Sequence, residues 1–98
     1  MKIIVQPLPS EGEEPTVTEI EDTLEAMQAV VGGLIEIVTL DDGYLAVVNE
    51  DGLFLGLEQN GPFSGVWFIC RCGPEGEIVG LTDEDIAIIL GLDEEVIA

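Results

Sequence analysis

The sequence has no histidine and only two basic residues, Lys2 and Arg71, against 21 acidic residues. Without histidine, the chain has no histidine general base, no histidine-containing catalytic triad and no histidine metal ligand. The formal net charge is −19, so few carboxylates can pair with a basic residue. Because such a surface repels phosphates, we expect no direct binding to nucleic acid or to anionic membranes, and attraction to basic protein surfaces.

Cysteines and long apolar runs are also scarce. Cys70 and Cys72 stand on one face of a predicted strand, and neighbours at this spacing form disulfides poorly. Without a nearby base or positive field, we interpret both as buried structural thiols. The longest uncharged stretch, 59–70, is too short and too polar to cross a membrane, and Pro7 arrives before any secretory apolar run can form. These features predict a cytoplasmic protein.

The residues that are present favour one folded domain. The chain has 98 residues, 47% of them hydrophobic, which is enough for one modest core and too apolar for a disordered acidic tail. Its centre predicts an antiparallel meander with strands at 34–40, 44–49 and 53–57. The segments between them, 41–43 and 50–52, fit three-residue hairpin loops in which a type I turn is followed by a left-handed glycine.

Further strands and two helices are predicted around this meander. The strands are expected at 2–6, 16–20, 66–72 and 77–81, and the first two can form a hairpin. One helix is expected to begin at Asp22, whose spacing to Glu25 fits a capping box, and to end at Gly32-Gly33. The other is expected to be capped by Thr82 and to end at Gly91. The order predicts a single α+β domain, in which both helices cover one face of a largely antiparallel sheet.

With these elements placed, the sequence resembles an uncharacterised family of bacterial and phage proteins, domain of unknown function 3846. The resemblance covers nearly the whole chain and rests on KIIV at 2–5, EIEDTLEAMQAVVGG at 19–33, LIEIVTLDDG at 34–43, VVNEDG at 47–52, the loop from Gly56-Leu57 to Asn60, and LTDEDI at 81–86. It implies a short protein of phages, plasmids or integrative elements, and it implies no established activity. Members often carry a basic residue after the position of Asn60, where this chain has Gly61.

The acidic surface is the first candidate site. Carboxylates can occupy the basic groove of a nucleic-acid-binding protein, since duplex DNA itself presents one charge per about 1.7 Å. The alternative is a surface that serves solubility, with its acids used in turns and helix caps. The acidic turns supply the candidate partner-binding residues Asp41, Asp42, Glu50 and Asp51. They lack the spacing of an EF-hand, so we predict neither a specific metal site nor a cofactor.

The polar loop 58–65 is the second candidate site. Asn60 and Gly61, together with Trp67 and Arg71, can line a pocket for a small ligand. The alternative is an ordinary turn with the aromatic side chains in the core.

The C-terminal residues leave the oligomeric state open between monomer and homodimer. Ile88, Val96 and Ile97 lie off the predicted core face, so they can form a dimer contact or fold back onto the sheet.

No catalytic motif is present, and the predicted function is binding. The sequence favours a small acidic, non-enzymatic accessory protein of a phage, a mobile element or its bacterial host, which binds a basic protein surface and, in the most specific version, mimics nucleic acid. The alternative is a protein that binds or sequesters a small ligand through loop 58–65. An enzyme is the remote alternative, since paired carboxylates can catalyse acid–base steps.

Overall fold

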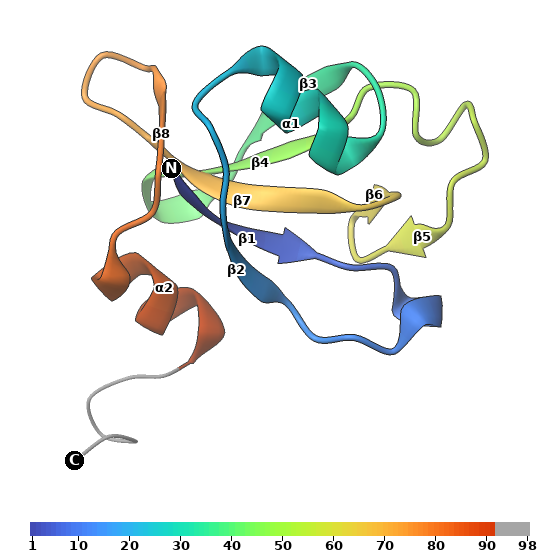
Figure 1. Ribbon diagram of the computed structural model, residues 1–98, viewed down its shortest axis with the longest axis horizontal. Helices are drawn as coiled ribbons and strands as arrows, with labels where there is room; N and C mark the ends of the chain where they lie inside the picture. Colours follow the sequence, from blue (N-terminus) through green and yellow to red (C-terminus); the bar gives the residue numbers. More distant parts are fainter. Residues whose placement is uncertain (92–98) are drawn as a thin grey trace.

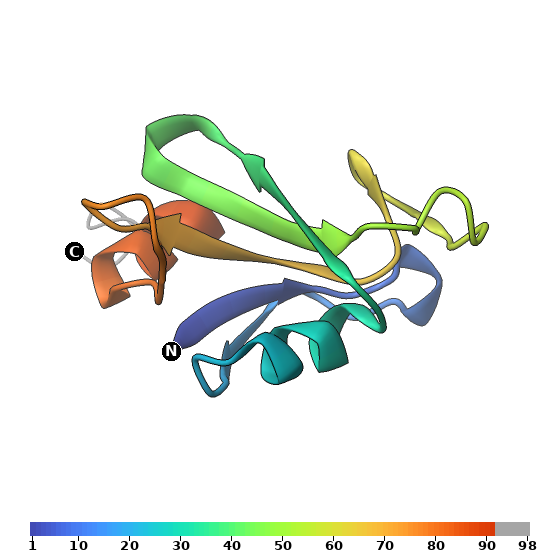
Figure 2. The same ribbon diagram turned by 90° about the horizontal axis from the view of Figure 1, so that it is seen from above.

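A computed structural model describes residues 1–91, and within them a six-stranded antiparallel sheet carries one α-helix on each face (Figures 1 and 2). The strands of this sheet are β1 (Lys2–Gln6), β2 (Thr16–Glu19), β3 (Ile35–Thr39), β4 (Tyr44–Asn49), β7 (Trp67–Cys72) and β8 (Ile78–Val79). A separate hairpin pairs β5 (Gln59–Asn60) with β6 (Phe63–Ser64). The helices are α1 (Leu24–Val31) and α2 (Asp83–Leu90). The predicted α+β class is confirmed.

The strand order is β2-β1-β7-β4-β3, with β8 pairing with the end of β7. The two hairpins predicted from local pattern, β1–β2 and β3–β4, are both present. Between them lies β7, which pairs with β1 on one side and with β4 on the other. Phe68 stands opposite both Val5 and Val47, and it is fully buried at this position. The central strand therefore comes from late in the chain and joins two local hairpins.

The prediction of a third meander strand at 53–57 is wrong. This segment forms turns, and the side chains of Leu53, Phe54 and Leu55 are 84%, 91% and 58% exposed. The place beside β4 is taken by β7, whose apolar residues fill both faces of the sheet at once. Consequently the preceding turn at 50–52 begins an exposed loop and closes no hairpin.

The sheet has an apolar core on each face because successive residues of a strand point to opposite sides. Ile3 packs with α1, in the cluster that holds Met27, Val31 and Phe68. Its neighbour Ile4 packs on the other side, against the face that α2 covers. In Figure 1, α1 lies at the top of the molecule and α2 at its lower left. The prediction that both helices cover one face is therefore wrong, since β4 and β7 are apolar on both faces and each face needs a cover.

Helix ends follow the expected capping chemistry with one shift. Thr23, and not Asp22, is the N-cap of α1, because its Oγ1 accepts a hydrogen bond from the Ala26 N–H at 3.1 Å. Gly32 ends this helix in the left-handed conformation, with φ of 78°. Thr82 caps α2 with a reciprocal contact from Asp85, and Gly91 ends it with φ of 76°.

The turn between β3 and β4 differs from the type I form expected. Gly43 has the left-handed conformation that was expected, with φ of 83°, but Asp42 also adopts a positive φ, of 62°, whereas a type I turn needs negative φ at both of its central residues. Aspartate tolerates this conformation better than most residues, since its short polar side chain can bond locally. The Leu40 N–H still donates to the Tyr44 carbonyl at 2.9 Å, so the hairpin is closed.

Candidate functional site

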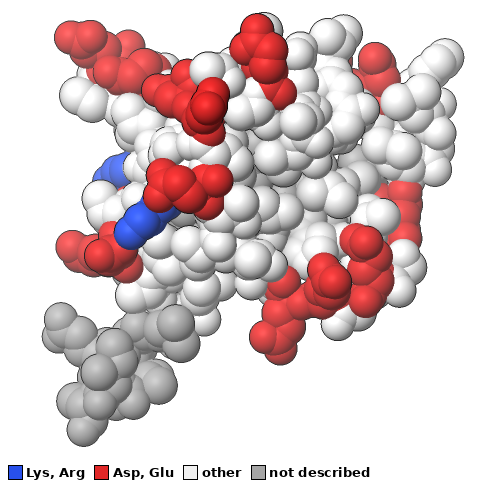
Figure 3. All heavy atoms as spheres, in the orientation of Figure 1, with Lys and Arg blue, Asp and Glu red and all other residues white. Residues whose placement is uncertain are grey.

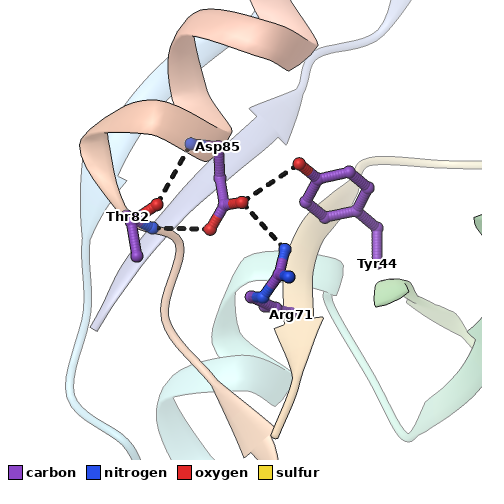
Figure 4. Close-up of polar contacts among 4 residues, drawn as sticks. All are labelled: Tyr44, Arg71, Thr82 and Asp85. Atoms are coloured by element: carbon purple, nitrogen blue, oxygen red, sulfur yellow. Dashed lines mark hydrogen bonds and ion pairs between the residues drawn. The ribbon is translucent and has the colours of Figure 1, made fainter. Parts of the chain in front are cut away.

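The first turn of α2 brings a buried carboxylate against the sheet (Figure 4). Asp85 is 6% exposed, and its Oδ1 accepts hydrogen bonds from the Tyr44 hydroxyl at 3.0 Å and from Arg71 Nη1 at 2.8 Å. Its Oδ2 accepts from the backbone N–H of Thr82 at 2.8 Å, and the Thr82 hydroxyl accepts from the Asp85 N–H at 3.1 Å. One aspartate thus completes the cap of α2 and fastens the helix to β4 and β7.

The electrostatics of this network keep Asp85 ionised. Burial raises the pKa of Asp85, but hydrogen bonds from Thr82 and Tyr44 and the charge of Arg71 outweigh it, so that the pKa lies below its ordinary value. Burial, and then the hydrogen bond to Asp85 and its charge, raise the pKa of Tyr44. The Arg71 guanidinium also lies 5.3 Å from the centre of the Tyr44 ring, in cation–π range. The acceptors of Asp85 are occupied, which favours a structural role for this carboxylate.

An open cavity of about 460 Å³ lies beside the network. Its lining residues are Asp42, Tyr44, Arg71, Thr82, Glu84, Asp85 and Ile88. Three carboxylates and one guanidinium give this cavity a net negative charge, and the guanidinium is already paired with Asp85. The cavity therefore suits a cationic group better than a phosphate or a carboxylate.

The four residues expected to line a ligand pocket are not brought together. Asn60 is 8% exposed, and its Nδ2 donates to the carbonyls of Gln6 at 3.0 Å and Gly65 at 3.1 Å. Trp67 Nε1 donates to the Asn60 carbonyl at 3.0 Å. Asn60 and Trp67 thus hold the β5–β6 hairpin against β1 and β7, with Gly61 in the exposed turn between β5 and β6. Arg71 lies four residues further along β7, in the network with Asp85.

Replacement of Asn60 by alanine is expected to lower the free energy of unfolding by about 1–3 kcal/mol, because one buried and one partly buried carbonyl lose their donor. Urea unfolding followed by Trp67 fluorescence measures this change. The matched control is Gln59→Ala, which removes the exposed amide side chain of the neighbouring residue. It should change the free energy of unfolding by no more than about 0.5 kcal/mol. If Asn60→Ala leaves the urea midpoint unchanged, the structural role of Asn60 is contradicted and its side chain is available to a ligand.

The acidic turns lie at opposite ends of β4. Asp41 and Asp42 precede the strand, and Glu50 and Asp51 follow it, so the two pairs are separated by roughly 17 Å of extended backbone. Figure 3 shows the acidic side chains of one face in separate groups, most of them near its edge and one beside a basic side chain left of the centre, with an uncharged area in the middle. Within residues 1–91, no three acidic or cysteine side chains come together in the manner of a metal site.

A second hollow, of about 270 Å³, lies where β3, β4 and the β5–β6 hairpin meet. Its lining residues are Glu36, Val48, Asn49, Glu50, Leu53, Gln59, Pro62, Phe63 and Ser64. It unites one predicted partner-binding residue, Glu50, with part of the predicted loop 58–65. Neither Glu36 nor Leu53 could be recognised as a site residue from the sequence, because the pattern at 53–57 predicted a strand and Glu36 has no distinguishing neighbour. The exposed apolar tip 53–55 lies beside this hollow.

The cysteines are free thiols inside the fold. Cys70 is fully buried under α1, and Cys72 is half-buried on the same face. Burial, with a smaller effect of the neighbouring Cys72, raises the pKa of the Cys70 thiol to about 12. A thiol held in this way is a poor nucleophile at neutral pH, in agreement with its interpretation as a core residue.

Of the three C-terminal apolar residues, the structure places only one. Ile88 is 59% exposed on α2 and lines the larger cavity. Val96 and Ile97 lie outside the described residues.

The pattern TDED at 82–85 predicted a helix cap at Thr82, but it gave no sign that Asp85 contacts Tyr44 and Arg71. No helix among residues 1–91 has the length and apolar character needed to span a membrane.

Comparison of the chain with curated proteins and with solved structures gave no match in either set. A family model matches residues 1–93, nearly the whole chain, and the protein therefore belongs to the family described as Domain of unknown function (DUF3846).

Proposed function

We propose that this chain is a non-enzymatic binding module that presents an acidic surface to a basic surface of another protein. The observation that carries the proposal is the negative charge of carboxylates that have no basic partner within the described part of the chain. Eighteen of the 21 acidic residues lie in the described part, since 93–95 fall outside it. Within that part, three carboxylates make ion pairs: Glu19 with the N-terminal amine, Asp83 with Lys2, and Asp85 with Arg71. Fifteen carboxylates are therefore left to attract a basic partner.

The arrangement of the charge supports a protein partner. On the face drawn in Figure 3, separate acidic groups border an uncharged area, and the exposed side chains Leu53, Phe54 and Leu55 add apolar surface. Protein interfaces combine an apolar core with a polar rim, whereas a bare nucleic-acid mimic needs a continuous row of charge. The more specific version of the proposal is that the partner is a nucleic-acid-binding protein of the phage, mobile element or host, whose basic groove the chain occupies; the amount of negative charge favours this version, and the separation of the acidic groups does not.

The binding of a small ligand is the second candidate function, and the cavity beside Arg71 is the observation that favours it. Its three carboxylates would select a cationic ligand. It lies away from loop 58–65, where the sequence had placed such a site.

The proposal is tested by recovering tagged protein from its own host at low and at high salt, with native mass spectrometry of what comes with it. We expect one basic protein at low salt that is lost at high salt, because exposed charge pairs are screened. The triple variant Glu36→Gln, Glu50→Gln, Asp51→Asn should weaken binding of that purified protein about tenfold, at about 0.5 kcal/mol for each exposed pair.

The matched control removes three charges elsewhere: Glu13→Gln, Glu14→Gln and Glu21→Gln, all exposed side chains. It should change the affinity by no more than about twofold. Bare protein at both salt concentrations, or a partner whose affinity neither salt nor either variant alters, contradicts the proposal.

A further inference from the structure

The most unusual surface feature of this acidic protein is an apolar loop tip formed by Leu53, Phe54 and Leu55. The exposed fractions of these side chains are 84%, 91% and 58%, and the Phe54 ring makes almost no contact with its own fold. Single exposed apolar residues are common, but three large ones in succession mark a surface that another molecule covers.

The base of this loop is held in place by hydrogen bonds. The Leu55 N–H donates to the Asp51 carbonyl at 2.8 Å, and the Leu57 N–H donates to the Gly52 carbonyl at 3.0 Å. Asn49, which is 6% exposed, accepts from the Asp51 N–H at 2.8 Å and donates to the Val31 carbonyl at 3.1 Å. The loop is thereby tied to the end of α1, and an ordered tip loses little conformational entropy on binding.

Glycine at position 52 is part of this anchoring. A Cβ atom there would lie 2.6 Å from the Ser64 carbonyl oxygen, which no real side chain tolerates. The loop base therefore lies directly against β6, and Leu53, at the start of the tip, lines the smaller hollow.

The surroundings of the tip are acidic. Glu50, Asp51 and Glu58 flank it in the chain, and Glu36 and Glu50 line the hollow next to Leu53. The basic side chains of the chain are engaged elsewhere, with Lys2 paired to Asp83 and Arg71 paired to Asp85. A second copy of this chain would set the same carboxylates against each other, and an anionic membrane would repel them. Charge therefore selects a basic occupant.

We propose that Leu53, Phe54 and Leu55 insert into an apolar cleft of a partner protein whose rim carries lysine or arginine. Phe54 is the central anchor, and the hollow between Glu36 and Glu50 receives one basic side chain of that rim. The aliphatic stem of such a side chain can lie on Val48 and Phe63, while its charged end meets the two carboxylates. This inference rests on the proposed function and adds where the partner is held.

The experiment replaces Phe54 by the photo-crosslinking residue p-benzoylphenylalanine in protein expressed in its own host, with the same residue at Leu34 as control. Leu34 is also an exposed apolar residue, at 56%, but lies outside the loop. The protein crosslinked at Phe54 is then purified and titrated with Phe54→Ser and Leu34→Ser. We expect at least a tenfold loss of affinity for Phe54→Ser, less than twofold for Leu34→Ser, and crosslinked peptides that contain lysine or arginine beside apolar residues.

The possible failures are separable. A partner whose binding is salt-sensitive but indifferent to Phe54→Ser overturns this inference and leaves the proposed function standing. Binding that neither salt nor Phe54→Ser changes overturns both. If Phe54 crosslinks only to a second copy and the protein sediments as a dimer, the tip binds another copy of the chain and this inference is overturned. If the protein is retained on phosphatidylcholine–phosphatidylglycerol vesicles, the tip binds lipid and this inference is likewise overturned. Absence of any crosslink at Phe54 also overturns it. Both serine variants replace exposed side chains, so their thermal midpoints should match the parent protein.

Discussion

Replacing Phe68 by alanine is expected to lower the free energy of unfolding by about 3–5 kcal/mol, the largest effect of any single change considered for this chain. Phe68 is fully buried in the central strand, where it stands opposite residues of both β1 and β4 and packs beneath α1. Its removal leaves a cavity that the neighbouring strands cannot close. Urea unfolding monitored by circular dichroism gives the value, which is a large part of the stability of a domain of this size.

The matched control is Phe54→Ala, because the meander inferred from the sequence would make Phe54 a strand residue. With 91% of its side chain exposed, its replacement should change the free energy of unfolding by less than about 0.5 kcal/mol. Equal losses for the two phenylalanines would contradict the position of β7 beside β4. They would restore 53–57 as a strand of the sheet.

Replacing Asp85 by alanine is expected to cost about 2–3 kcal/mol of stability. The change removes the acceptor of three donors, from Tyr44, Arg71 and Thr82, and leaves them without a partner beside the open cavity. The loss is less than for a fully buried pair, because the Arg71 side chain is 39% exposed and water screens it. Asp83→Asn is the control, since Asp83 pairs with Lys2 at the surface; its replacement should change the thermal midpoint very little.

The contribution of Asp85 should also depend on pH in a defined direction. Its pKa is lower in the folded chain than the ordinary value of about 3.9, so the folded state binds this proton less readily than the unfolded state does. The stabilisation is therefore complete above about pH 5 and is lost as the pH falls through the folded pKa. The difference in stability between the parent protein and Asp85→Asn should shrink between about pH 5 and pH 2. A difference that is constant over this range contradicts the network.

Several local features could be predicted from the sequence because they depend on residues close together in the chain. Both outer hairpins, the cap at Thr82 and the helix ends at Gly32 and Gly91 formed as expected, since turn and capping chemistry acts within a few residues. The burial of Cys70 and the scarcity of ion pairs also followed from composition and pattern.

The candidate sites were less predictable, because they are made of residues that meet only after folding. The cap at Thr82 was predicted, but nothing near Asp85 in the sequence pointed to its contacts with Tyr44 and Arg71, which bridge 41 and 14 residues of sequence. Asn60 and Trp67 had the polar and aromatic character of a ligand pocket, and the fold uses them to hold a hairpin to the sheet. No local pattern distinguishes these two uses.

The sequence by itself therefore determined the class of the fold, the ends of its elements and an excess of negative charge that no folding pattern can neutralise. Only the tertiary structure decided which strand lies beside β4, and with it which apolar residues are core and which are surface. Leu53–Leu57 and Trp67–Cys72 are both apolar enough to pair there, but β7 is the longer segment and pairs with β1 on its other edge, so that it joins the two hairpins into one sheet. Because β7 takes the place beside β4, the side chains of Leu53, Phe54 and Leu55 are left exposed.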